Sequence, residues 1–248
     1  MKRLLSKFMS KFSFPHDIDS KEKLEEYAIY YGILPFFPNP INGLSVEEMA
    51  APGMLFGGNS YEGCWEWKGP VIRNRTTAYG KFFRKKAGFV SLELLPDFLN
   101  YRRFVNPVKE GSMDEMLLDI IRENDSLTST ELRQLIFGGR KRTDWRDLPE
   151  SSLIPNEDSG KRKSLEGPLQ RLQMGGRIII SDFEYKKTKS GERYGWGVAR
   201  YSTPEIIFPD LVDKTDQRSP EESLETLITF LRSRSPFANR NKILELIK

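Results

Sequence analysis

The stretch that decides the fold runs from Ser164 to Tyr201 and reads SLEGPLQRLQMGGRIIISDFEYKKTKSGERYGWGVARY. Its first part has apolar residues at helical spacing behind Ser164, a residue type that caps helix starts, and the Gly175-Gly176 pair ends the predicted helix. Two β-branched and aromatic runs follow, residues 177–185 and 193–201, on either side of a polar turn. The stretch therefore predicts a helix followed by a β-hairpin.

Two further helices are predicted upstream of this stretch. An apolar face at positions 116, 117, 120 and 121 predicts the first. After a turn at residues 125–127, Thr128 and Glu131 form a capping-box pattern that starts the second. Three helices and a hairpin in this order are typical of a winged helix-turn-helix, which binds DNA or serves as a protein-protein or spacer module. We predict an α+β fold in which a winged helix-turn-helix domain packs with an aromatic-rich N-terminal part.

Charge is distributed in a way that suits a polyanion. The chain of 248 residues has a formal net charge of +4 and a pI near 9.0, and basic residues cluster around the third helix and the hairpin. Double-stranded DNA is therefore the predicted partner. On the third helix we predict that Gln170, Arg171 and Gln173 contact base edges. The phosphate contacts predicted at the hairpin tip are Lys186, Lys187, Lys189 and Arg193.

The composition argues against several other classes of protein. Hydrophobic residues make up 38% and charged residues 30% of the chain, as in a soluble globular protein. No apolar run approaches the roughly 20 residues that a membrane span requires, and we expect a cytoplasmic protein without a membrane partner. Cys64 and His16 are the only residues of their types, which leaves no Cys/His metal centre and no disulfide framework. We predict no metal and no cofactor.

The chain divides by composition into three parts. We predict an aromatic and glycine-rich part at 1–110, the winged-helix domain at 111–208 and a helical extension at 209–248. Inside the second part, residues 138–163 form a charged insertion between helices that either contacts DNA or is a surface loop. The first 19 residues interleave basic and apolar side chains, which predicts an amphipathic segment that docks on the body of the protein or lies on a membrane surface.

Aromatic residues are concentrated between residues 52 and 110. They suggest a pocket for an extruded base or a small ligand, although core packing is the more ordinary role. Within Trp65-Glu66-Trp67-Lys68, the alternation favours a strand whose Glu66 points to solvent. If chemistry occurs, Glu66 is nevertheless the best catalytic candidate, since two tryptophans could remove water from its carboxylate. The possible pocket residues are Trp65, Trp67, Tyr79, Lys81 and Phe82.

Several segments resemble a known family. The runs Tyr79–Ser91 and Pro96–Arg103, together with Tyr194-Gly195-Trp196 and Tyr201–Glu205, look similar to a bacterial group related to the AlkZ-like winged-helix DNA glycosylases. The resemblance covers about residues 20 to 208 and implies a scaffold used in DNA repair. Those glycosylases share a catalytic Gln-x-Gln motif, and this sequence contains none, so no catalytic residue is transferred.

Three functions follow as expectations. The first is a winged-helix protein that acts by binding duplex DNA. The alternatives are a glycosylase-like enzyme acting on a flipped modified base and a regulator that senses a small ligand. An open cavity with an unpaired carboxylate beside Trp65, Trp67 and Tyr79 would favour the alternatives, whereas a closed core there favours DNA binding.

Overall fold

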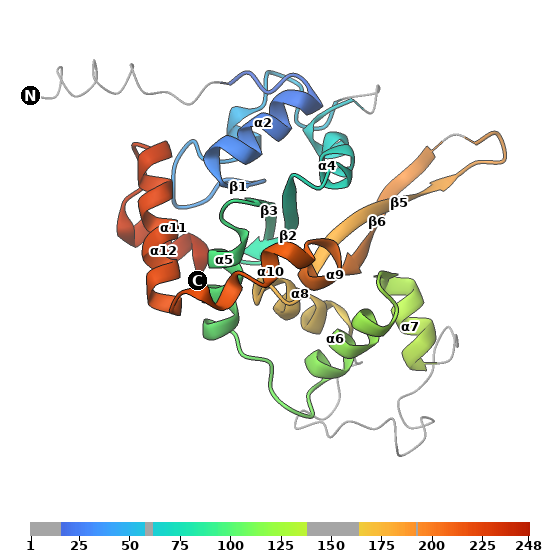
Figure 1. The fold of residues 1–248 in the computed structure, drawn as a ribbon. Coiled ribbons are helices and arrows are strands. Elements are labelled where there is room, and N and C mark those ends of the chain that lie inside the picture. Colours follow the sequence, from blue (N-terminus) through green and yellow to red (C-terminus); the bar gives the residue numbers. More distant parts are fainter. Residues whose placement is uncertain (1–15, 58–61, 138–163, 192) are drawn as a thin grey trace, which may run out of the picture.

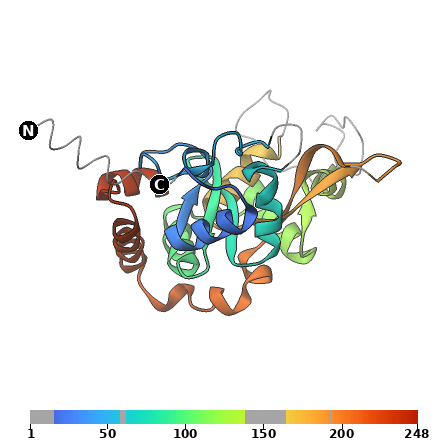
Figure 2. The same cartoon turned by 90° about the horizontal axis from the view of Figure 1, so that it is seen from above.

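The structure is a computed structural model that describes residues 16–57, 62–137, 164–191 and 193–248. Two separate three-stranded antiparallel sheets are surrounded by helices, which confirms the predicted α+β class. One sheet belongs to the N-terminal half, and the other is built around a long hairpin that projects from the body (Figures 1 and 2). The predicted insertion at 138–163 and the segment 1–15 lie outside the described residues.

The N-terminal sheet has the strand order β1-β3-β2. The helix before it begins where the Ser20 hydroxyl accepts a hydrogen bond from the Lys23 amide, and it ends at Gly32 with a φ of 71°. The elements of this half are α2 (Lys21–Tyr31), β1 (Ile33–Pro35), α3 (Val46–Met49), α4 (Cys64–Arg73), β2 (Thr77–Phe83), β3 (Lys86–Ser91) and α5 (Leu95–Val105).

The second sheet has the order β4-β6-β5, so the last strand lies between the other two. A short strand pairs with the hairpin at Leu127↔Tyr201 and separates the first two helices of this region. The elements are α6 (Met113–Glu123), β4 (Leu127–Thr128), α7 (Ser129–Phe137), α8 (Glu166–Met174), β5 (Ile179–Lys187) and β6 (Arg193–Ser202).

The predicted pairing of residues 177–185 with 193–201 is confirmed. Cα partners run from Ile179↔Ser202 at the base of the hairpin to Lys187↔Arg193 near its tip. Gly191 adopts a φ of 86° in the turn, a conformation that glycine tolerates without strain. The predicted end of α8 at the Gly175-Gly176 pair is confirmed as well, since Gly176 has a φ of 64°.

The C-terminal residues pack back onto the N-terminal half. Asp97 of α5 accepts hydrogen bonds from Arg218 at 2.7 Å and from the Ser223 hydroxyl at 2.8 Å, which fixes α11 against α5. A capping box of Ser219 and Glu222 starts α11. The elements are α9 (Pro204–Ile207), α10 (Pro209–Val212), a 3₁₀ turn (Thr215–Gln217), α11 (Pro220–Arg234) and α12 (Arg240–Ile247).

Buried apolar side chains form two cores. The larger one joins the N-terminal sheet to α2, α5, α11 and α12. The smaller one is formed by α6, α7 and α8. The isoleucine triplet at the start of the hairpin connects them, because Ile178 belongs to the smaller core and Ile179 and Ile180 belong to the larger one. The base of the hairpin is thereby anchored in both.

The strand predicted at Trp65-Glu66-Trp67-Lys68 was wrong, because these residues lie in helix α4. Cys64, Lys68, Val71 and Ile72 have the i, i+4, i+7, i+8 spacing of one helical face, and all four are buried. The buried lysine concealed this apolar stripe. The alternation of tryptophans with charged residues is therefore not the alternation of strand faces.

Candidate nucleic-acid interface

The hairpin tip carries the basic residues that the sequence singled out for phosphate contacts. Lys186 and Lys189 are exposed, and the backbone of Lys186, Lys187 and Arg193 forms the last rungs of the hairpin. The turn is closed by a 3.0 Å hydrogen bond from the Gly191 amide to the Thr188 carbonyl. The fold thus gathers the backbone of these residues at the end of one long projection (Figure 1).

Helix α4 and the loop after it brace the side of the hairpin. The Tyr185 hydroxyl donates to the Glu66 carboxylate at 2.9 Å, and Arg73 pairs with Asp182 at 2.9 Å. Arg75 donates to the carbonyl of Ser181 at 3.2 Å. These contacts lie along β5 between its base and its tip. They fix the direction in which the hairpin leaves the body.

Lys68 lies beneath this brace in an aromatic cage. Its side chain points between the rings of Trp65 and Phe183, with 3.9 and 4.6 Å from Nζ to the two ring centroids, and Nζ donates to the Trp65 carbonyl. Only 3% of the residue is exposed. Burial lowers the pKa of Lys68 to about 8. The cation-π contacts hold a charged group where water cannot solvate it.

The three residues predicted to read bases from α8 do not share one environment. Gln170 is half-buried, and Arg171 is exposed but forms a bidentate pair with Asp114 of α6 at 2.8 and 2.6 Å. This pairing raises the pKa of the Arg171 guanidinium. Gln173 is 1% exposed, and its amide accepts from the Lys81 backbone at 2.9 Å and donates to the Leu169 carbonyl at 3.1 Å. Gln170 and Arg171 are therefore the two that reach solvent.

The five possible pocket residues are not brought together around one opening. Tyr79 and Phe82 lie in the larger core, 2% and 0% exposed, against Phe89 and Phe98 respectively. Trp65 and Trp67 are half-buried at the edge of the same core. The Lys81 side chain is exposed on β2. The Tyr79 and Phe82 rings are thus closed off in packed core.

Arg102 is a structural residue that no pattern in the sequence predicted. It is fully buried at the end of α5, where Nε donates to the Met174 carbonyl at 2.5 Å and Nη1 donates to the Ile247 carbonyl. These carbonyls lie at the C-terminal ends of α8 and α12, where helix dipoles concentrate negative charge. No sequence signal indicates such a role, because the partners lie far away in the chain.

Other kinds of site find no support within the described ranges. There, no three His, Cys, Asp or Glu side chains are arranged to hold a metal ion. No helix in the part of the chain that the structure describes is long and apolar enough to cross a membrane.

The fold and the surface together define an α+β protein with a braced, basic hairpin. The sequence matches the AlkZ-related family over residues 18–248, and the chain belongs to this family. The resemblance seen in the sequence is thereby confirmed. No curated protein and no solved structure matched the chain.

Proposed function

We propose that residues 111–208 are a winged helix and that the protein binds duplex DNA through it. In this proposal residues 1–110 and 209–248 are the scaffold that holds this domain. The order of α6, β4, α7, α8, β5 and β6, with β6 between the other strands, supports the assignment. The observation that carries the proposal is the projecting hairpin with exposed lysines near its tip.

The proposed contacts differ in kind. Lys186, Lys187, Lys189 and Arg193 neutralise phosphates, which supplies affinity without reading sequence. Gln170 and Arg171 contact base edges. To do so, Arg171 gives up its hydrogen bonds to Asp114 and forms new ones with the DNA. Gln173 takes no part, since both ends of its amide are engaged inside the protein.

A gel-shift or anisotropy titration of duplex DNA tests the hairpin. Changing Lys186, Lys187 and Lys189 to Glu should weaken binding to every sequence, and it should flatten the plot of log affinity against log salt by about 0.9 for each phosphate that is no longer neutralised. The matched control changes the same number of charges at Lys214, Arg232 and Lys242 on the C-terminal helical region. Equal affinity of the two triple variants would contradict the proposed interface.

Family membership favours a second candidate, release of a modified base from DNA. The half-buried Glu66 is then the catalytic group, with the Tyr185 hydroxyl orienting its carboxylate. Incubation with alkylated duplex DNA, followed by a search for abasic sites, tests it. The control variant is Glu62→Gln. If the wild type and Glu62→Gln release the base and Glu66→Gln does not, the primary function is catalysis and not binding alone.

A ligand-sensing role is the weakest of the three. It rests on an open cavity beside the tryptophans with an unpaired carboxylate. Tyr79 is instead packed in the core, and the Glu66 carboxylate accepts a hydrogen bond from Tyr185. DNA binding therefore remains the function that the geometry supports best.

A further inference from the structure

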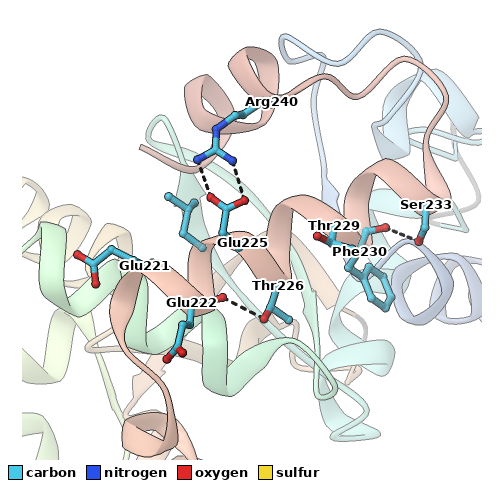
Figure 3. Close-up of a pocket in the computed structure, with 9 residues that line it drawn as sticks. Glu221, Glu222, Glu225, Thr226, Thr229, Phe230, Ser233 and Arg240 are labelled. Atoms are coloured by element: carbon cyan, nitrogen blue, oxygen red, sulfur yellow. Dashed lines mark hydrogen bonds and ion pairs between the residues drawn. The ribbon is translucent and has the colours of Figure 1, made fainter.

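The outer side of α11 carries a groove of about 770 Å³ that the proposed DNA-binding surface does not use. Leu224 and Phe230 supply apolar lining, and the carboxylates of Glu221, Glu222 and Glu225 lie along it (Figure 3). Arg240 at the start of α12 closes one side by pairing with Glu225 at 2.5 Å. The groove therefore combines apolar surface with an acidic border.

The end of α2 extends this surface. Ile29 and Tyr30 are 43% and 50% exposed, which is unusual for large apolar side chains that lie next to one another. The Arg234 guanidinium lies 4.6 Å from the Tyr30 ring centroid and 5.3 Å from that of Phe230, so it joins α2 to α11. We call the exposed end of α2 together with the groove the α2–α11 surface. A partner that suits it is basic and amphipathic.

We propose that residues 1–15 of this chain bind the α2–α11 surface. Their sequence, MKRLLSKFMSKFSFP, contains four basic side chains and no acidic one, interleaved with apolar residues. The apolar side chains would cover Ile29 and Tyr30, and the basic ones would face Glu26 of α2 and the carboxylates of the groove. The complementarity thus involves both hydrophobic burial and charge.

The position of the chain allows this contact. The described residues begin just before α2, and α2 leads directly to the groove, since Phe230 of α11 packs beside Gly32. The 11 residues of α2 cover about 16 Å at a helical rise of about 1.5 Å per residue. Fifteen residues span about 22 Å as a helix and up to about 50 Å when extended. Either conformation reaches the groove by running back along α2.

Photocrosslinking in the full chain tests the proposal. A benzophenone amino acid placed at Phe8 should crosslink to peptides containing residues 26–31 or 220–234, in the band of the monomer. The matched control places the same group at Phe56, an exposed ring in the loop before α4 that contacts Trp65. Crosslinks from Phe8 confined to other peptides, or found only in a dimer band, would overturn the proposal.

Charge reversal distinguishes specific docking from random contact. Changing Glu26 and Glu221 to Lys should reduce the yield of the crosslink from Phe8 about fivefold. This factor corresponds to the roughly 1 kcal/mol that exposed ion pairs contribute to binding. Changing the exposed Glu93 and Glu110 to Lys alters the charge equally elsewhere and should leave the yield unchanged. An equal yield in both double variants would also overturn the proposal.

Discussion

Replacing Arg102 with methionine tests how the protein accommodates a buried cation. Burial lowers the pKa of the Arg102 guanidinium to about 10, well below its ordinary value. This difference corresponds to about 3 kcal/mol of desolvation that a methionine avoids. Against it, the carbonyls of Met174 and Ile247 lose charged donors, which costs about 2.5 kcal/mol each when they stay unpaired. The expected net result is a destabilisation of about 2 kcal/mol.

Urea unfolding at pH 7, followed by tryptophan fluorescence, measures this difference. The slope against denaturant should remain unchanged, because the variant folds to the same structure and exposes the same area. The control Arg232→Met replaces an exposed arginine of α11 and should change stability by less than about 0.5 kcal/mol. An Arg102→Met protein as stable as the wild type would refute the reasoning, since relief from desolvation would then fully offset the lost pairing of the two carbonyls.

Two other predictions concern buried polar groups. Burial lowers the pKa of Lys68 from 10.5 to about 8, so its charge destabilises the fold fully below pH 8 and less as the pH rises toward 10.5. Urea unfolding should therefore show wild-type stability rising by about 3 kcal/mol relative to Lys68→Met across that window, and a constant difference would contradict the desolvation argument. Gln173→Leu should cost about 1 to 2 kcal/mol in the same assay by leaving the Lys81 amide unpaired, without altering DNA affinity. Gln170 is half-buried, and the opposite pattern is expected for Gln170→Leu. Its free energy of unfolding should change by less than about 0.5 kcal/mol, whereas its affinity for DNA should fall.

Local sequence signals predicted the elements whose causes are local. Thr128 and Glu131 form the expected capping box, and the β-branched run predicted at residues 177–185 forms the first strand of the hairpin from Ile179. Hairpin β2–β3 was missed because its turn is Arg84-Lys85, with φ of 48° and 69°, where Asn-Gly is the usual signal. The chain adopts positive φ there without the residues that normally indicate it.

Buried charges could not be predicted from the pattern. Lys68 occupies an apolar position of α4, but only Phe183 of the distant hairpin completes the cage that explains it. Arg102 is paired across 72 residues to Met174 and across 145 residues to Ile247. The rule that charged side chains lie on the surface is correct on average. It fails where carbonyls at helix ends or aromatic rings contact the buried charge in place of water.

The same long-range contacts bear on how α8 could meet DNA. Gln173 fixes one side of the helix to β2, and Arg102 fixes its C-terminal end to α5 and α12. Moving α8 would break these bonds at about 1 to 3 kcal/mol each, because the groups would remain buried without partners. In the proposed complex the helix therefore meets DNA in its present position, and adjustment falls to exposed side chains such as Arg171. Binding of this kind loses little conformational entropy, so most of the phosphate attraction contributes to affinity.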